Sequence, residues 1–443
     1  MPEAFIRKLS AKMAVYEKGE IRDVVERRTP VSVHEAIHKV MRRVVKGPSE
    51  TTALKNTYGR FLGEDVIADH DVPHFHRSRY DGYAIQSENT QSASPEHPVE
   101  FKVIDAIGAG CTTSKTVHDG QAVRIMTGAQ IPDHCDAVIM LEETKAFEKQ
   151  GQSFMTVTKA LASGENVIFK GEDVKEGTVL LTKGTYINPG VRAVLAAFGY
   201  SRVKVTKKPE IGIYTTGTEL LDISEPLVPG KIRNSNGQML QAQIERAGGK
   251  PFDLGRLNDN FEACYQSIAQ ALESFDYLIT TGGVSVGDFD YLPAVYKKLG
   301  AHVLFNKIAM RPGSVTTVAE YNGKLLFGLS GNPSSCYVGF ELYVRPVIRT
   351  YLNSPKPYLK KIRARLSVDF PPNSFTRFVR SNVSFCHGKW RVSPTGLDKP
   401  HMISSLVEAN ALAVLPGGTE GYIRDQMVDV LLLNEESQSS ESL

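Results

Sequence analysis

The chain has 443 residues, 41% hydrophobic and 23% charged, a composition typical of a globular protein with material for about three compact domains. Its 52 basic and 49 acidic residues leave a formal net charge of +3 and form no basic tract, so we expect no nucleic-acid partner. No run of about 18 apolar residues occurs, and we therefore expect no segment that spans a membrane.

The N-terminal region and the cysteines bear on the cellular compartment. Residues 1–28 mix acidic with basic side chains and lack the apolar core of a signal peptide, so we interpret them as an N-terminal extension. The five cysteines are far apart in the chain and form neither a C-x-x-C pair nor a metal-finger spacing. This number and spacing of cysteines favours a reducing, cytoplasmic environment.

The first predicted element is a helix over residues 31–45, VSVHEAIHKVMRRVV, whose apolar residues recur at helical spacing. Ser32, followed three residues later by Glu35, predicts a capping box at its start. From about residue 69 to 200, short apolar stretches are broken by Gly, Pro and Asp, with turns such as KQGQ between them. This pattern is typical of β-strands.

INPGVRAVLAAFGY, at residues 187–200, returns to a helical pattern after these strands. We therefore expect a mixed α/β lobe built from residues 29–70 and 155–206. A β-rich lobe, residues 71–154, would be inserted into it.

The pattern of apolar residues changes in the second half of the chain. Over residues 207–353, short apolar strands alternate with helical patterns of ten to fifteen residues, which predicts a three-layer, mostly parallel α/β sheet domain. Residues 354–435 contain apolar stretches without helical period and predict a β-barrel-like module, and the polar residues 436–443 predict a disordered tail. The expected fold class is thus a multidomain α/β plus β protein.

Three predicted strands of the α/β domain end in unusual loops, TTGTEL, TTGGVSVGDFD and SGNPSS. The ligand crevice of an open parallel sheet lies beyond the carboxyl ends of its strands, so one crevice should collect all three loops. Glycines at 282, 283 and 287 allow positive φ and bring backbone N–H groups close to an anion, beside a helix that begins near Asp290. The pattern predicts a phosphate site.

Acidic residues accompany these glycines. Asp288 and Asp290 would repel a phosphate unless a divalent cation lay between them, and oxygen ligands favour Mg²⁺. The alternative is that the glycines form a tight turn and one aspartate caps the following helix. Glu219 and Asp259, at other strand ends of the same sheet, favour the cation, because converging carboxylates repel one another without one.

Basic and polar residues supply further candidates. Lys307 and Arg311 could hold an oxyanion or a phosphate, or could form salt bridges to the acids. Ser334 and Ser335 are predicted to cap a helix. His74 and His76 fit surface histidines better than a metal pair, because no third ligand is nearby in the sequence.

Seven motifs occur along the chain in this order: DGYA (81–84), TGAQIP (127–132), GED (171–173), TTGTEL, TTGGVSVGDFDY, RPG (311–313) and GNP (331–333). The same motifs occur in the same order in the molybdopterin molybdenumtransferases, and the chain resembles this family from about residue 29 to 433. These are the molybdenum insertases of molybdenum-cofactor synthesis, related to the E domain of gephyrin. TTGGVSVG alone would also fit the molybdopterin adenylyltransferases.

The resemblance implies a reaction in which adenylylated molybdopterin binds, molybdate enters at the dithiolene sulfurs, and the phosphoanhydride is hydrolysed to release AMP. It implies Mg²⁺ held by Asp259 and Asp290. It matches further positions to functional residues of the family, with catalytic roles for Asp81, Thr127, Asp173, Glu219, Lys307 and Arg311. The resemblance implies that the substrate is bound by Gly282, Gly283, Ser285, Gly331, Pro333, Arg380 and Ser405.

The resemblance also implies a homodimer with a composite site, and a molybdopterin adenylyltransferase and apo-molybdoenzymes as further partners. Four residues depart from the common family pattern: Ser314 stands at an expected lysine, Arg311 replaces a lysine, Ser330 replaces a proline, and Tyr80 replaces a methionine. A molybdopterin-binding carrier or scaffold without insertase activity, or a molybdopterin adenylyltransferase, are the alternative functions.

Overall fold

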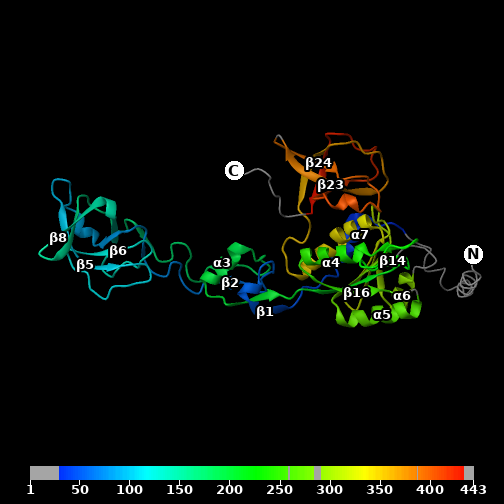
Figure 1. Ribbon diagram of the computed structural model, residues 1–443, viewed down its shortest axis with the longest axis horizontal. Helices are drawn as coiled ribbons and strands as arrows, with labels where there is room; N and C mark the ends of the chain where they lie inside the picture. Colours follow the sequence, from blue (N-terminus) through cyan, green and yellow to red (C-terminus); the bar gives the residue numbers. More distant parts are fainter. Residues whose placement is uncertain (1–28, 258–259, 284–290, 387, 434–443) are drawn as a thin grey trace, which may run out of the picture. The chain divides into compact units, whose positions relative to one another are not determined.

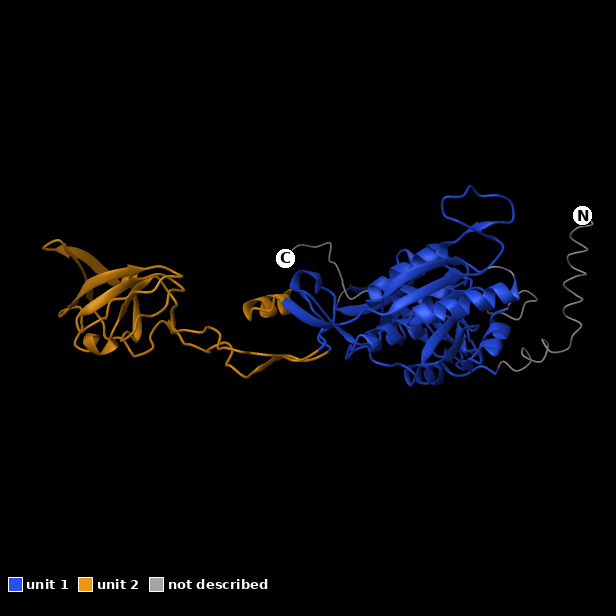
Figure 2. Cartoon of the chain, turned by 90° about the horizontal axis from the view of Figure 1, so that it is seen from below, with its two compact units in different colours: residues 1–63, 184–188, 202–443 blue, residues 64–183, 189–201 orange. Residues whose placement is uncertain are grey.

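The computed structural model describes residues 29–257, 260–283, 291–386 and 388–433. The chain divides into two compact units (Figure 2). Unit 1 consists of residues 1–63, 184–188 and 202–443, and unit 2 of residues 64–183 and 189–201. The finer domain boundaries expected from the sequence remain predictions.

A six-stranded sheet lies at the centre of unit 1, in the order β16-β13-β17-β21-β20-β18 (Figure 1). The first four strands are parallel, and the last two pair antiparallel. The strands are β13 (Glu210–Thr215), β16 (Lys250–Arg256), β17 (Tyr277–Thr281), β18 (His302–Phe305), β20 (Thr317–Tyr321) and β21 (Lys324–Leu329).

Helices cover both faces of this sheet. Strand β17 shows why: Tyr277 and Ile279 pack into one hydrophobic core, and Leu278 between them packs into another. The first core includes α2 (Val33–Met41), α4 (Ser235–Ala247), α7 (Pro333–Gly339), a π-helical turn (Phe340–Val344) and α8 (Arg345–Tyr351). The second includes α5 (Phe261–Ser274) and α6 (Leu292–Leu299). The predicted three-layer α/β architecture is confirmed.

Helix α2 is shorter than the sequence predicted. Its cap is present, because the Ser32 hydroxyl accepts from the Glu35 N–H at 3.1 Å. The C-terminal end of the prediction is wrong: the helix ends at Met41 rather than at residue 45. The Gly47 N–H donates to the Tyr351 carbonyl at 2.8 Å, and this tertiary contact draws the chain out of the helical path.

The end of unit 1 forms a closed five-stranded barrel, which confirms the β-barrel-like prediction. The ring runs β23-β24-β22-β26-β25 and closes through pairing of β25 with β23, while β19 (Met310–Arg311) joins the edge of β23. Its strands are β22 (Lys361–Leu366), β23 (Thr376–Cys386), β24 (Lys389–Pro394), β25 (Ala411–Leu415) and β26 (Met427–Leu432). Two small pairs complete unit 1: β1 (Ser49–Ala53) with β12 (Arg202–Thr206), and β14 (Leu220–Leu221) with β15 (Ile232–Arg233).

Unit 2 is built on a second six-stranded sheet, in the order β7-β4-β6-β5-β9-β8, with one hydrophobic core on each face. The predicted KQGQ turn joins β8 to β9, with Gln150 and Gly151 both at positive φ. The strands are β4 (Gly82–Ile85), β5 (Val99–Ile107), β6 (Gln121–Ile125), β7 (Ala137–Met140), β8 (Thr144–Lys149) and β9 (Gln152–Val157). The remaining elements are β2 (Val66–Ile67), β3 (Arg77–Ser78), β10 (Val167–Ile168), β11 (Val179–Leu181) and α3 (Pro189–Ala197).

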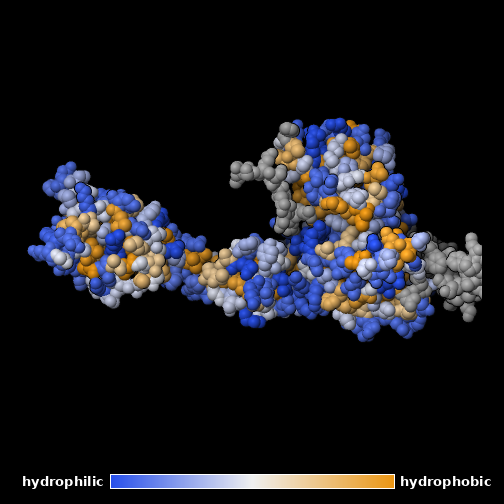
Figure 3. All heavy atoms as spheres, in the orientation of Figure 1, coloured by the Kyte–Doolittle hydropathy of each residue, from blue (hydrophilic) through white to orange (hydrophobic). Residues whose placement is uncertain are grey.

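On the face shown in Figure 3, hydrophilic side chains are interspersed with scattered patches of apolar ones. Among the helices in the described part of the chain, none has the length and apolar character needed to cross a bilayer. All five cysteines are free thiols.

Candidate functional site

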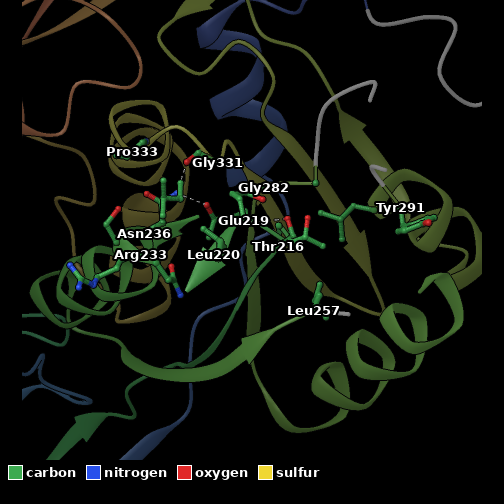
Figure 4. A pocket seen from close by; sticks show the side chains of 18 of the residues that line it. Thr216, Glu219, Leu220, Arg233, Asn236, Leu257, Gly282, Tyr291, Gly331 and Pro333 are labelled. Atoms are coloured by element: carbon green, nitrogen blue, oxygen red, sulfur yellow. Dashed lines mark hydrogen bonds between the residues drawn. The ribbon is translucent and has the colours of Figure 1, made fainter. Parts of the chain in front are cut away.

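A pocket of about 550 Å³ lies at the carboxyl ends of β13, β17 and β21 (Figure 4). Its wall includes Thr216 to Leu220 after β13, Gly282 and Gly283 after β17, and Gly331 and Pro333 after β21. The three loops singled out in the sequence therefore share one crevice, as predicted. The volume lies within the range of about 300–1,000 Å³ usual for small-molecule sites.

The glycine turn after β17 needs glycine for two reasons. Gly282 and Gly283 have φ of +84° and +65°, which side-chain-bearing residues rarely adopt. A Cβ on Gly282 would also lie 2.6 Å from the Thr216 hydroxyl oxygen and 2.8 Å from its carbonyl oxygen. The turn thus brings the β17 loop and the β13 loop into close backbone approach.

The pocket has two chemically different ends (Figure 4). Leu257, Cys264, Tyr291 and Leu292 make one end apolar and aromatic. At the other end, β15 and the start of α4 contribute polar side chains, namely Arg233, Asn234, Ser235 and Asn236. Such a pocket suits a ligand that joins a flat ring to polar groups.

Sequence reasoning missed the polar residues at the start of α4. Asn234 caps this helix by accepting from the Gly237 N–H at 3.0 Å, and its amide nitrogen lies 3.3 Å from the Thr215 hydroxyl. Asn236 donates to the Thr281 hydroxyl and to the Gly331 carbonyl. The available signal was the run NSNG, since Asn is a preferred N-cap residue.

The predicted site residues fall into four groups. Five line the pocket: Glu219, Gly282, Gly283, Gly331 and Pro333. A second group belongs to unit 1 but does not line the pocket: Lys307, Arg311, Arg380 and Ser405. A third group belongs to unit 2: Asp81, Thr127 and Asp173. Ser285, Gly287, Asp288, Asp290 and Asp259 lie outside the described residues.

The two stretches that carry the predicted metal ligands are flanked by pocket residues. Leu257 and Tyr291, which both line the pocket, lie within two residues of Asp259 and Asp290 in the sequence. Among the described residues, no group of three or more His, Cys, Asp or Glu side chains could hold a metal ion. The described lining residues that carry side-chain oxygens are Thr216, Thr218, Glu219, Asn234, Ser235, Asn236, Thr281 and Tyr291.

Hydrogen bonds from Lys231 and Ile232 fix the loop that carries Glu219. The Ile232 N–H donates to the Glu219 carbonyl at 2.8 Å, and the Lys231 ammonium donates to the Thr218 carbonyl. The Glu219 carboxylate lies against Gly217, where a Cβ would come within 2.4 Å of it. The carboxylate is thus held beside the backbone of its own loop.

Lys307 and Arg311 were expected to bind an anion or to pair with acids. Within the described part of the chain, neither side chain forms an ion pair. Arg311 is exposed, and it lies opposite Arg377 where β19 pairs with β23.

Arg380 and Ser405 contact each other inside the barrel module. The Arg380 side chain is 1% exposed and donates to the Ser405 hydroxyl at 3.1 Å and to the Asp398 carboxylate at 3.0 Å. It also donates to the carbonyls of Leu397 and Lys399, both at 3.2 Å. Burial lowers the pKa of the guanidinium below its ordinary value, although Asp398 opposes this. Arg380 therefore fixes the loop of residues 397–405.

This loop contacts the beginning of α7, beside the pocket. The Ser334 N–H donates to the Pro400 carbonyl at 3.1 Å, and the Ser334 hydroxyl donates to the Met402 carbonyl at 2.8 Å. The prediction that Ser334 and Ser335 cap α7 is therefore wrong: both lie inside the helix, and Asn332 occupies the N-cap position. The hydroxyl binds a carbonyl 68 residues away in sequence, a partner that no local pattern reveals.

In unit 2, Asp81 and Thr127 form one cluster. One oxygen of the Asp81 carboxylate accepts from both the backbone N–H and the hydroxyl of Thr127, each at 2.7 Å. These two bonds hold the pKa of Asp81 below its usual value. The Asp173 N–H donates to the Val72 carbonyl at 3.0 Å, and its side chain is exposed.

The histidines of unit 2 make ring and backbone contacts. His74 packs edge-on against Phe75, with ring centroids 4.5 Å apart. The His76 Nδ1 accepts from the Lys170 N–H at 3.1 Å.

Three family models match consecutive parts of the chain. Residues 31–199 match the MoeA N-terminal region (domains I and II), residues 212–350 a probable molybdopterin binding domain, and residues 363–433 the MoeA C-terminal region (domain IV). A molybdopterin molybdenumtransferase from Bacillus subtilis is 54% identical over 94% of this chain and 97% of its own length. The chain belongs to the molybdopterin molybdenumtransferase family.

Other relatives agree with this assignment. A molybdopterin molybdenumtransferase from Staphylococcus aureus is 46% identical over 95% of this chain and its whole length. A crystal structure of a molybdopterin biosynthesis MoeA protein from Pyrococcus horikoshii has a TM-score of 0.81 at 29% identity, covering 92% of this chain and all of that one. The protein is therefore a transferase with a role in molybdenum cofactor biosynthesis.

Proposed function

We propose that this protein inserts molybdenum from molybdate into adenylylated molybdopterin, with hydrolysis of the phosphoanhydride and release of AMP. The observation that carries the proposal is the pocket itself, whose glycine loops meet at the carboxyl ends of three parallel strands. Backbone N–H groups at such a position suit a pyrophosphate. The apolar end with Tyr291 suits a flat base, because aromatic side chains stack favourably on rings.

Mg²⁺ is the cofactor that this donor set favours. Oxygen atoms are the ligands that Mg²⁺ prefers, and the described lining residues offer the Glu219 carboxylate together with threonine and serine hydroxyls. Asp259 and Asp290 are proposed as the remaining ligands. When bound, Mg²⁺ would neutralise the negative charge of the pyrophosphate.

The protein's own residues would orient the nucleotide. The turn at Gly282 and Gly283 presents backbone to the phosphates, while Leu257, Tyr291 and Leu292 exclude water from the base. Glu219, on a loop fixed by its own backbone bonds, would accept a proton or orient the attacking water. Asp81, ionised and held by Thr127, and Asp173 are proposed to act from unit 2 of a partner copy in a homodimer.

Molybdate, a tetrahedral dianion, requires cations. Lys307 and Arg311 are the proposed ligands, because neither is neutralised by an ion pair with a described residue. Arg380 and Ser405 remain proposed ligands, although their contact inside the barrel occupies the described donors of Arg380. A guanidinium at position 311 can hold an oxyanion through two parallel hydrogen bonds, which offsets the absence of a lysine at Ser314.

The test is AMP release from adenylylated molybdopterin by the purified protein, with and without molybdate and Mg²⁺. We expect release that depends on both, and abolition by EDTA with recovery on adding Mg²⁺. Tight binding without release would favour a carrier or scaffold instead. A cytoplasmic location, and contacts with a molybdopterin adenylyltransferase and apo-molybdoenzymes, stay predictions.

A further inference from the structure

Asn236 occupies an unusual position at the pocket. It is the second residue of α4 and is 8% exposed, and it lies at the polar end of the pocket between the β17 and β21 loops (Figure 4). A buried amide must find partners, because an unsatisfied polar group costs about 1–3 kcal/mol. Its partners therefore indicate what it does.

The amide nitrogen of Asn236 joins two loops that belong to different strands. It donates to the Thr281 hydroxyl at 2.9 Å and to the Gly331 carbonyl at 2.8 Å. A carbonyl oxygen can only accept, so the Gly331 contact fixes which end of the amide is the nitrogen. Both hydrogens of this nitrogen are thereby used.

These two contacts lie next to the glycines of the predicted phosphate site. Thr281 immediately precedes Gly282, and a Cβ on Gly331 would lie 3.5 Å from the Gly282 Cα. The Gly282 N–H is itself bonded to the Leu329 carbonyl at 3.0 Å, and the Thr281 hydroxyl donates to the Ser330 carbonyl at 3.2 Å. The Asn236 side chain thus adds two contacts to the bonds that hold together the two loops whose backbone faces the ligand.

We propose that Asn236 is a positioning residue for nucleotide binding: it holds the Gly282–Gly283 turn and the Gly331 loop at the spacing that a pyrophosphate requires. The proposal rests on the proposed function for the identity of the ligand. Donors aimed in advance at an anion bind it more tightly, because no reorganisation is needed when it arrives. Asn236 acts through the loops and need not touch the phosphates.

The carbonyl oxygen of Asn236 makes the test specific. It is buried and has no hydrogen-bond partner among the described residues. Asn236→Asp keeps the size of the side chain but replaces the donating nitrogen with an acceptor, which would face the Gly331 carbonyl and repel it. At low pH the buried carboxyl would become protonated and could again donate one hydrogen bond.

A matched control is present on the same helix. Gln243 is 4% exposed, donates to Glu341 at 2.7 Å, and also has a carbonyl oxygen without a partner among the described residues. It lies outside the pocket lining. Gln243→Leu therefore removes a buried amide from α4 without touching either loop.

The first experiment measures binding of Mg²⁺–ADP, a probe of the nucleotide phosphates, by titration calorimetry at pH 7.5. Loss of the Asn236 donor should weaken binding by about 10- to 100-fold. Part of this loss should be recovered at pH 5.5 in Asn236→Asp but not in Asn236→Leu. Gln243→Leu should bind as the wild type does. Wild-type affinity in Asn236→Asp, or an equal loss in Gln243→Leu, would overturn the proposal.

A second experiment does not depend on the ligand. Hydrogen exchange of the ligand-free protein should show faster exchange of peptides that cover residues 280–283 and 329–331 in Asn236→Asp, with no change there in Gln243→Leu. If the wild type fails to bind Mg²⁺–ADP but the exchange result holds, the proposed function fails and the positioning role stands. Unchanged exchange in these peptides would refute the positioning role itself.

Discussion

Gly282→Ala tests whether the turn after β17 requires glycine in the way that its geometry indicates. The residue has φ of +84°, and a Cβ there would lie 2.6 Å and 2.8 Å from two oxygens of Thr216. Thr216 cannot easily move away, because its N–H donates to the Thr281 carbonyl at 2.9 Å. The substitution therefore combines backbone strain with a steric overlap.

The two contributions can be separated by a control. A left-handed conformation costs a residue with a Cβ about 1–2 kcal/mol, and overpacking against a fixed neighbour costs about 1–3 kcal/mol more. Gly300, the C-cap of α6, has φ of +71°, but a Cβ there would meet nothing within 4 Å. Gly300→Ala should therefore carry only the first cost.

Calorimetry of the purified variants checks this reasoning. Gly282→Ala should lower the unfolding temperature by about 4–10 °C and Gly300→Ala by roughly half as much. In Mg²⁺–ADP titrations Gly282→Ala should lose binding and Gly300→Ala should keep it. Equal unfolding temperatures for the two variants, with intact nucleotide binding in Gly282→Ala, would refute the argument.

Two further substitutions probe buried and exposed carboxylates. Arg246 pairs with the fully buried Glu341, whose pKa is raised by burial while Arg246 opposes the rise. Arg246→Met should destabilise the protein by about 2–4 kcal/mol, since Arg345 still lies 3.8 Å from the carboxylate. Because the pKa of Glu341 is raised in the folded state, the folded protein keeps a proton on this carboxyl that the unfolded chain releases. The loss of stability in Arg246→Met should therefore grow as the pH rises from 5 to 8. An equal loss of unfolding free energy at both pH values, measured by urea unfolding, would contradict this. Thr127→Val removes the hydroxyl that donates to Asp81 and should therefore raise the pKa of this carboxyl, whereas Thr127→Ser keeps a hydroxyl and should not. An unchanged Asp81 titration in Thr127→Val, followed by NMR, would disprove the contact.

Local chemistry made the fold largely predictable. The period of the apolar residues, the Ser32 cap and the glycine turns all act within a few residues of one another, so the alternating strands and helices followed directly. The common crevice also followed, because parallel strands end on the same edge of a sheet. The ends of elements were less predictable: α2 stops at Met41, where a contact from Gly47 to Tyr351 intervenes.

The site was predictable only where its residues carry a local signature. Glycines and acidic residues at strand ends have a recognisable sequence pattern, so they were predicted as site residues. Asn236 lies in the first turn of a helix, where asparagine is common, and was not predicted. Its partners, Thr281 and Gly331, lie 45 and 95 residues further along the chain. Ser334 shows the same limit, because its hydroxyl binds a carbonyl of the barrel module rather than its own helix.

The most direct test of the central claim is reconstitution of an apo-molybdoenzyme. The purified protein would be incubated with adenylylated molybdopterin, Mg²⁺ and molybdate, and the product supplied to the apoenzyme. We predict enzyme activity that depends on this protein and on molybdate, together with one AMP released for each cofactor formed. AMP release without reconstitution, or reconstitution that is equally efficient without this protein, would contradict the account.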